Sequence, residues 1–509
     1  MTSLLFHNAN VVTMAAEVLE AEAVAVSDGV IIAVGDAEAA ASALGSDVRR
    51  FDCNSGVLLP AFIDAHCHLL SYAASLLAVD CTAARSIEEI QDAIRQRATR
   101  TPAGTWIRAF GYEETQLTEA RHPTADDLNA ATAEHPVRLI HSSGHARVLN
   151  SAALRLAGID GSTEEPMGGT IERDLDSGEP NGVLIGMERL VDQAVPDLSY
   201  KELSGAVCEA SRRLLAAGVT TIQDATHTNG LSEWTLFEQL MADDSLMLDV
   251  IMMEGSEHLG ELPERVRNGR LVRGPVKVML HELENTKPDI GEVVALTQSV
   301  QTAHALGRQI AIHAIGEQAV FHAVEALEAA LLRSPREGHR HRVEHCSVLP
   351  DGMAARIAKL GINVVSQPSF IRTRGDRYLQ LLPERQLERL YAFRTLSEAG
   401  VPLAASSDAP VTRPNPLASV ASAVDRAAAS GVAIGPGEAV GTVEALGWWT
   451  VGAARAAFQE ATRGVIRPGA VADLVLLPKD VLSASPERLR TYAPLSVWRR
   501  GEQVVPEAT

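Results

Sequence analysis

Short apolar runs alternate with longer amphipathic stretches through the second half of the chain. Runs of strand-like composition lie at residues 218–224, 248–253, 276–280, 309–313, 341–345, 362–367 and 402–408. The stretches between them, such as residues 292–306, repeat their apolar positions at helical spacing. With an earlier run at residues 57–68, this makes eight strands that alternate with helices. The pattern predicts a (β/α)8 barrel. The alternative is an open doubly wound sheet, but no glycine-rich phosphate-binding motif supports it.

The two ends of the chain carry a different pattern, with short strands broken by turns. Near the beginning these strands lie at residues 23–27, 29–35 and 56–59, and near the other end at residues 464–477 and 495–505. We therefore expect one small β-sandwich domain built from residues 1–59 and 461–509. The barrel would occupy residues 60–460 between them.

The interval between the first and second barrel strands is unusually long, from about residue 70 to about residue 205. Its second half is rich in turn residues, as at 158–161 and 176–182. A connection of this length in a compact domain must have structure of its own and is usually functional. We expect an insertion over the mouth of the barrel.

His66 and His68 end the first predicted barrel strand. Side chains alternate between the two faces of a strand, so these two imidazoles point the same way and can share one metal ion. A pair of histidines one residue apart also arises by chance on half-exposed strands. The pair alone therefore does not establish a metal site.

Further metal-ligating residues stand where later strands end, the place where barrel enzymes carry their catalytic groups. They are Lys277, His313, His345 and Asp408. Each has an ordinary alternative: a hydrogen-bonded core histidine for His313, a surface pair with Glu344 for His345, and a helix cap for Asp408. The ordinary explanations would have to coincide at every strand end, so the set together indicates a metal centre.

Of these residues, Lys277 gives the strongest single indication of an unusual site. It alternates with Val276 and Val278 on a strand that should be covered on both faces. If the valines face the surrounding helices, the lysine faces the interior of the barrel. A buried, unpaired ammonium group is unstable there, so it would be neutralised, paired or modified. A lysine that extends to solvent from the strand's end is the alternative.

The composition excludes some classes of partner. The chain of 509 residues has 45 basic and 65 acidic residues, a net charge of −20, which disfavours nucleic acid and anionic membranes. Neither a signal-peptide pattern nor a membrane-length apolar run is visible, and the five cysteines share no disulfide spacing. We expect a cytoplasmic protein that acts on a small molecule, and a homo-oligomer such as a dimer stays open.

Taken in order, these motifs resemble the amidohydrolase superfamily of metal-dependent hydrolases, and more narrowly its YtcJ-like, amidohydrolase-3 branch. The resemblance rests on residues 58–68, 312–316, 343–345, 407–410 and the closing segment 464–476, with residues 143–145, 150–154 and 168–169 in the insertion. It therefore extends over nearly the whole chain.

The resemblance implies a divalent metal centre with His66, His68, His313, His345 and Asp408 as ligands. Lys277 would be carboxylated and bridge two ions, as in binuclear members. Zinc is the default for histidine and carboxylate ligands, with manganese, iron or cobalt as alternatives and one or two ions per chain. Two segments depart from the branch: Leu280-His281-Glu282 replaces an Asp-Gly-rich stretch, and Gly111-Tyr112-Glu113 replaces Gly-Trp-Asp.

The chemistry expected of such a centre is hydrolysis of a C–N bond in an amide, an N-acyl compound or a cyclic amide. Asp408 would take a proton from the attacking water and pass it to the leaving nitrogen. His145 or His345 would help to polarise the carbonyl. The expected substrate-binding residues are Tyr112, His145, His281, Arg372 and Arg374. A decarboxylase, an ester or carbamate hydrolase, and a metal-free scaffold are the alternatives.

Overall fold

The computed structural model describes residues 3–15, 21–45, 48–166, 169–264, 269–280 and 289–506. The chain forms two compact units. The first consists of Met1–Leu69 and Ser211–Thr509, and the second of Leu70–Ala210. Helices α2 (Leu69–Leu76) and α7 (Tyr200–Ala216) contain residues of both units.

Within the described residues of the first unit, eight parallel strands form one sheet in the order β20-β19-β18-β17-β16-β15-β14-β7. They are β7 (Phe62–Cys67), β14 (Val219–Asp224), β15 (Asp249–Gly255), β16 (Leu271–Val278), β17 (Ile310–Ala314), β18 (Arg342–His345), β19 (Asn363–Ser366) and β20 (Leu403–Ala405). After β20, the backbone N–H of Asp408 donates to the carbonyl of His66 at 2.8 Å and brings the two edges together. The predicted (β/α)8 barrel is confirmed.

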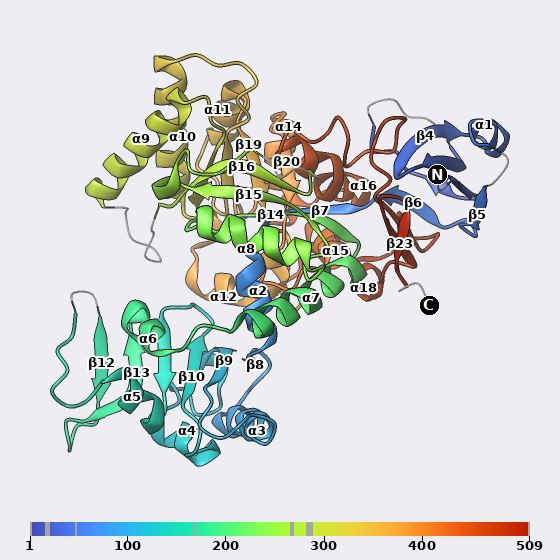
Figure 1. Ribbon diagram of the computed structural model, residues 1–509. Coiled ribbons are helices and arrows are strands. Elements are labelled where there is room, and N and C mark those ends of the chain that lie inside the picture. The colour runs from blue at the N-terminus through green and yellow to red at the C-terminus, as the bar shows by residue number, and fades with distance from the viewer. Residues whose placement is uncertain are drawn as a thin grey trace. The chain divides into compact units, whose positions relative to one another are not determined.

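Helices follow the strands and lie on the outside of this sheet (Figure 1). They are α8 (Leu231–Ala242), α9 (Ile290–Ala305), α10 (Glu317–Arg333), α11 (Met353–Leu360), α12 (Ser369–Leu381), α13 (Glu384–Leu387), α14 (Phe393–Glu398), α15 (Pro416–Asp425), α16 (Thr442–Gly447) and α17 (Ala453–Arg455). Helix α10 shows why they pack there: its buried residues Val320, Val324 and Leu327 recur every three or four positions and form one apolar face. That face covers the sheet, as expected from the helical spacing.

Two further sheets contain the strands of the chain's ends. One has the order β4-β3-β1-β5, from β1 (Ser3–His7), β3 (Ala23–Ser27), β4 (Val30–Gly35) and β5 (Arg49–Asp52). The other has the order β2-β6-β21-β22-β23, from β2 (Asn10–Val11), β6 (Val57–Pro60), β21 (Leu474–Leu477), β22 (Ser496–Arg499) and β23 (Glu502–Val505). Buried Phe6, Leu58, Leu474 and Trp498 belong to one hydrophobic core drawn from both sheets. The expected β-sandwich is present, with the short helix α1 (Ala37–Ser42) beside it, whereas α18 (Pro486–Thr491) packs against α15 of the barrel.

A cluster of charges joins this sandwich to the amino-terminal end of a barrel strand. The buried carboxylate of Asp249, the first residue of β15, contacts the guanidinium groups of Arg463, Arg499 and Arg500. Burial alone would raise the pKa of Asp249, but the three arginines lower it. The cluster lies at the opposite end of the strand from the expected site, where barrels carry residues that serve stability.

The second unit is a structured insertion built around a six-stranded mixed sheet in the order β12-β13-β11-β10-β9-β8. Its strands are β8 (Val79–Asp80), β9 (Ile107–Tyr112), β10 (Val137–His141), β11 (Ala146–Leu149), β12 (Thr170–Arg173) and β13 (Pro180–Ile185). The helices are α3 (Ile87–Ala98), α4 (Ala125–Ala131), α5 (Ser151–Ala157) and α6 (Glu188–Ala194). Ile90 and Ile94 of α3 pack with Leu128 of α4 and Leu139 of β10 in its core. The insertion is therefore a small folded unit rather than a loop.

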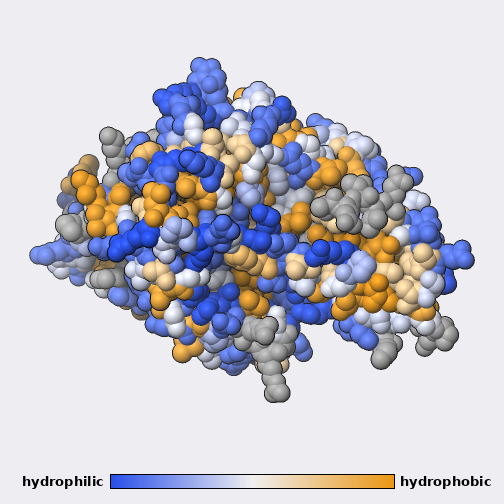
Figure 2. Space-filling view, turned by 90° about the horizontal axis from the view of Figure 1, so that it is seen from above, coloured by the Kyte–Doolittle hydropathy of each residue, from blue (hydrophilic) through white to orange (hydrophobic). Residues whose placement is uncertain are grey.

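The surface carries no membrane-crossing element in the part of the chain that the structure describes. No helix there combines the length and the apolar character needed to span a bilayer. Hydrophilic and hydrophobic residues are interspersed over the face shown in Figure 2.

Candidate metal centre

The barrel brings the predicted ligands to one rim. His66 lies on β7, Lys277 on β16, His313 on β17 and His345 on β18, each within the last two residues of its strand, while Asp408 follows β20. Because the strands are parallel, their carboxyl ends meet at the same edge of the barrel. Residues separated by more than 300 positions in the sequence thus become neighbours.

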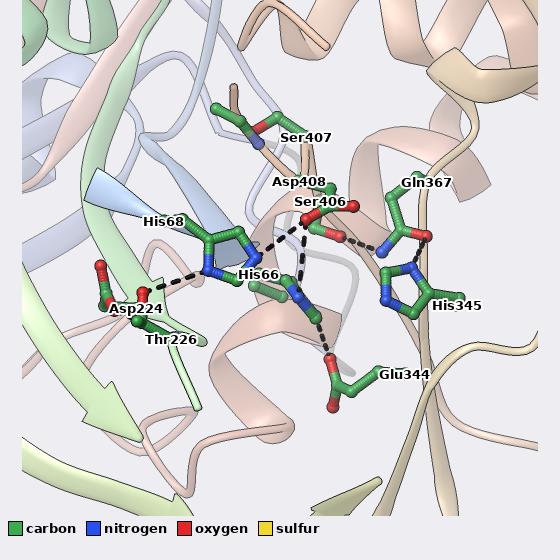
Figure 3. A network of polar contacts seen from close by, with 12 residues as sticks. His66, His68, Asp224, Thr226, Glu344, His345, Gln367, Ser406, Ser407 and Asp408 are labelled. Atoms are coloured by element: carbon green, nitrogen blue, oxygen red, sulfur yellow. Dashed lines mark hydrogen bonds and ion pairs between the residues drawn. The ribbon is translucent and has the colours of Figure 1, made fainter. Parts of the chain in front are cut away.

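Asp408, His66 on β7 and His68 just after β7 form the tightest part of this group. The Oδ1 atom of Asp408 lies 3.2 Å from Nε2 of His68 and 3.6 Å from Nε2 of His66. Figure 3 shows all three side chains pointing toward one another. Their ligand atoms lie within 4.8 Å of one another. Three ligand atoms this close together can hold one divalent ion.

The remaining residues of the set surround this trio. The Nζ atom of Lys277 lies 3.5 Å from Nε2 of His66. The imidazole ring of His345 is centred 4.9 Å from the ring of His66 and 4.5 Å from that of His313. Lys277 is 1% exposed, so its side chain points into the barrel and does not extend to solvent.

Glu344 orients His66. Its Oε2 atom accepts a hydrogen bond from Nδ1 of His66 at 2.6 Å, and Arg342 holds the same carboxylate at 2.7 and 3.0 Å. All three side chains are buried. With Nδ1 as the donor, the Nε2 lone pair of His66 faces Asp408 and Lys277, which is the tautomer that a metal ligand needs.

His345 has the same kind of support. Its Nδ1 atom donates to Oε1 of Gln367 at 2.9 Å, and Gln367 in turn donates to Ser406 at 2.9 Å (Figure 3). Its Nε2 atom is buried and has no hydrogen-bond partner among the described residues. A buried polar atom without a partner is destabilising, and a metal ion would satisfy it. The Nδ1 atom of His68 lies 3.1 Å from Oγ1 of Thr226, which leaves its Nε2 atom facing Asp408.

Burial sets the protonation states that metal ligation requires. It lowers the pKa of His66, His313 and His345 below the ordinary histidine value, so the three rings are neutral. Burial opposes ionisation of Asp408, but the hydrogen bond from His68 and the surrounding histidines lower its pKa. Burial also lowers the pKa of Lys277 to about 8, against the opposing charges of Glu344 and Asp408.

Two of the predicted ligands sit in a strained backbone conformation. His345 has φ 67° and Asp408 has φ 55°, in the left-handed region that non-glycine residues rarely occupy. Each such residue costs on the order of 1–2 kcal/mol, and the surrounding structure must impose it. For Asp408 that structure includes buried Asp64, which accepts hydrogen bonds from the backbone and hydroxyl of the preceding Ser407.

The sequence did not single out the buried partners Arg342, Gln367 and Asp64, and it placed Glu344 in an alternative surface pair. That alternative is wrong, because Glu344 is fully buried and pairs with His66 and Arg342. The only available signal was the alternation of Arg342 and Glu344 on a strand expected to be covered on both faces.

The predicted substrate-binding residues lie in several places. Tyr112 and His145 belong to the second unit; Tyr112 is buried and bonds His122 at 2.8 Å, whereas His145 is exposed on a turn. Arg372 and Arg374 lie on α12, and the guanidinium of Arg372 donates to the carbonyl of Ala428. His281 falls outside the described residues. The roles of all five residues stay predictions.

A second group of metal-capable side chains occurs in the insertion. The Nε2 atom of buried His141 lies 2.6 Å from Glu114 and 3.4 Å from Glu113. No motif in the sequence indicated this group. A histidine between two carboxylates also forms an ion pair when it is protonated, so the contacts alone do not define a metal site.

The sequence is similar to one protein family along most of its length. The model of the amidohydrolase family matches residues 49–505. The N-substituted formamide deformylase of Arthrobacter pascens is 29% identical over 534 residues, covering 98% of each chain. The amidohydrolase YtcJ of Bacillus subtilis (strain 168) is 28% identical over 515 residues, covering 95% of this chain and 96% of the relative.

Solved structures agree on the fold. An uncharacterized metal-dependent hydrolase from Pyrococcus horikoshii OT3 superposes with a TM-score of 0.78 at 24% identity, covering 96% of this chain and 99% of the other. An adenosine deaminase from Xanthomonas campestris with bound zinc superposes with a TM-score of 0.56 at 16% identity, covering 99% and 92%. The chain belongs to the amidohydrolase family of metal-dependent hydrolases, and to its YtcJ-like branch.

Proposed function

We propose that the protein hydrolyses a C–N bond in an amide, an N-acyl compound or a cyclic amide, with water activated by one or two divalent ions. The observation that carries the proposal is the meeting of His66, His68 and Asp408 at the carboxyl rim of the barrel. Beside them lies the buried Nε2 atom of His345, which has no hydrogen-bond partner among the residues that the structure describes. The name of the Arthrobacter relative, a deformylase of N-substituted formamides, supports an amide as the substrate.

The donor set suits a divalent ion. We propose His66, His68, His313, His345 and Asp408 as the residues that hold it, with zinc as the expected metal. When bound, the ion lowers the pKa of water toward about 7 and polarises the substrate carbonyl.

Asp408 is the proposed proton carrier. Its lowered pKa keeps it a carboxylate at neutral pH, able to accept a proton from the attacking water. The peptide N–H bond to His66 and the anchoring of Ser407 by Asp64 fix the position of this carboxylate. After the tetrahedral adduct forms, the same carboxyl group passes its proton to the leaving nitrogen, so that an amine departs.

Lys277 is the proposed bridge between two ions. The neutral amine would attack carbon dioxide and form an N–C bond, and loss of one proton would leave a carbamate anion. Carboxylation would replace the amine, which is a cation when protonated, with an anion beside His66 and His313. The two oxygens of the carbamate could ligate two ions. The buried position of Lys277 at 3.5 Å from Nε2 of His66 supports this role.

Elemental analysis followed by a substrate screen tests the proposal. We expect stoichiometric divalent metal in the purified protein and turnover of at least one N-formyl, N-acyl or cyclic amide, which Asp408→Asn abolishes. Asp351→Asn is the control, because Asp351 is an exposed surface residue. Turnover of esters or carbamates alone, or release of carbon dioxide from a carboxylate, would replace the amidase assignment. A protein that binds no metal would reject it.

A further inference from the structure

A cavity of about 540 Å³ lies entirely within the insertion. Its wall includes the carboxyl-terminal turn of α3, the beginning of β9 and the segment that leads into α7. A volume of this size is typical of sites for small molecules, which run from about 300 to 1,000 Å³. None of the residues predicted for catalysis or metal binding lines it.

Three arginines line the cavity. They are Arg97 in the last turn of α3, Arg100 just after it, and Arg108 on β9. Among the residues that the structure describes, none of the three has a carboxylate oxygen within 4.0 Å. Arg97 and Arg108 each donate one Nη2 bond to a carbonyl, of Leu77 and Pro196. Most of their donors remain available.

Four other arginines of the same unit contact carboxylates. Arg95 contacts Asp92, Arg121 contacts Asp127, and both Arg138 and Arg147 contact Asp192. In a chain with a net charge of −20, carboxylates are abundant. Among the described residues, the guanidinium groups of Arg85, Arg155 and Arg173 of this unit also lack a carboxylate contact. The distinguishing feature of the cavity is therefore that three such arginines line one space.

The two acidic residues that line the cavity, Asp80 and Glu202, accept hydrogen bonds from residues close to them in the sequence. Asp80 accepts hydrogen bonds from the backbone and hydroxyl of Thr82 at 3.0 and 2.6 Å. Glu202 accepts from the backbone and hydroxyl of Ser199 at 2.9 and 2.6 Å and so caps the start of α7. Both carboxylates therefore stabilise local turns. Within the described residues, neither makes an ion pair with the three arginines.

Helix polarity explains only part of this arrangement. Arginines are favourable at the end of a helix, which accounts for Arg97 and Arg100. Arg108 is on a strand, where that explanation does not apply. Burial lowers its pKa by disfavouring the charged form, and the charges of Glu202 and Asp197 oppose this only in part. A half-buried guanidinium whose nearest acids in the described part of the chain lie beyond direct contact would be stabilised further by an anion in the cavity.

We propose that this cavity binds a small organic anion with at least two negative charges, carried by carboxylate or phosphate groups. Guanidinium groups match the planar oxygen pairs of both, with two parallel N–H···O bonds from each. The apolar side chains of Leu77, Val79 and Trp106 line the same cavity and would contact the carbon part of the ligand. The proposal does not depend on the reaction at the barrel.

Titration calorimetry on the whole protein at constant ionic strength tests the proposal. The probes are tricarballylate for polycarboxylates, phenyl phosphate for phosphate esters, and acetate as a monoanion. We expect one of the first two to bind with a stoichiometry of one, and acetate not to saturate. Arg97→Gln and Arg108→Gln should each weaken binding about tenfold, equal to about 1.4 kcal/mol. Arg95→Gln should leave it unchanged, because Arg95 lies on α3 but pairs with Asp92.

The two probes also distinguish the kinds of anion. A preference for tricarballylate would identify carboxylate groups as the feature recognised, and a preference for phenyl phosphate would identify a phosphate group. The proposal is overturned if neither probe binds at up to about 10 mM, a limit that corresponds to negligible affinity. It is also overturned if Arg97→Gln and Arg108→Gln bind as the unchanged protein does, because the anion would then occupy another site, such as the barrel. Thermal melting of each variant confirms that it is folded.

Discussion

Nδ1 of His66 and Oε2 of Glu344 lie 2.6 Å apart inside the barrel, although 278 positions separate the two residues in the sequence. Arg342 donates hydrogen bonds to both oxygens of the same carboxylate. The contacts from Arg342 to Glu344 and from Glu344 to His66 therefore fix the orientation and the tautomer of the imidazole. The contribution of Glu344 to metal affinity can be measured by substitution.

Glu344→Gln should weaken metal binding by about 10–100-fold, the usual effect of removing a carboxylate that orients a ligating histidine. Competition with a chelating dye would measure the affinity. Glu328→Gln is the matched control, because Glu328 also pairs with an arginine, Arg356, but at the half-exposed surface. Equal metal affinity in both variants would show that Glu344 does not orient a ligand.

His66→Asn and His68→Asn should each lower the bound metal and abolish hydrolysis while the fold is kept. Each removes one of the three donors that converge at the rim. Elemental analysis, activity and circular dichroism measure the three properties. His322→Asn on α10 serves as the control. Full metal content and full activity in both rim variants would contradict the proposed centre.

Asp408→Asn should retain part of the metal and lower kcat by about 10²–10⁴-fold, the range for loss of a general acid–base group. The amide keeps the size of the side chain but cannot accept the proton. Near-normal turnover with bound metal would instead make Asp408 a structural residue.

Lys277→Met should reduce the metal content from two ions per chain to at most one. Adding bicarbonate should raise the metal content of the unchanged protein but not of this variant. The control is Lys359→Met, since Lys359 is exposed on α11. One ion per chain in the unchanged protein, unaffected by bicarbonate, would establish a mononuclear site.

His341 should make the protein sensitive to acid. This ring, just before β18, accepts a hydrogen bond from the backbone of Ile310 at 3.1 Å and bonds His304 at 2.9 Å. Burial, with nearby His339 and Arg336, lowers its pKa from 6.5 to about 2. The unfolded chain therefore binds more protons below pH 6.5, and this contribution to stability is lost as the pH falls, by up to about 1.4 kcal/mol per pH unit.

Urea unfolding between pH 7.5 and pH 5 measures this dependence. His341→Gln should unfold more easily at pH 7.5 but lose less stability on acidification than the unchanged protein. His322→Gln should keep the original slope. An identical slope in His341→Gln would show that other groups cause the acid sensitivity.

The barrel and its rim were predictable because they follow from local patterns. Alternation along a strand places His66 with His68 and turns Lys277 inward, and parallel strands must end at one edge. The supporting contacts were not predictable, because the hydrogen-bond partner of a buried group is chosen by tertiary packing. Nothing near His66 in the sequence indicates Glu344, and nothing near His345 distinguishes Gln367 from any other polar residue after a strand.

The sandwich core joins the two ends of the chain, since β6 pairs with β21 so that Leu474 lies opposite Pro60. A growing chain can fold the insertion and then the barrel strands as they leave the ribosome. It cannot complete this sheet until β21 has been made, and until then the apolar side chains of β6, which leads directly into the strand carrying His66, lack their cover. Maturation of the proposed metal centre should therefore follow the synthesis of β21, and chains that stop before β21 should be substrates for chaperones and proteases rather than partly active enzymes.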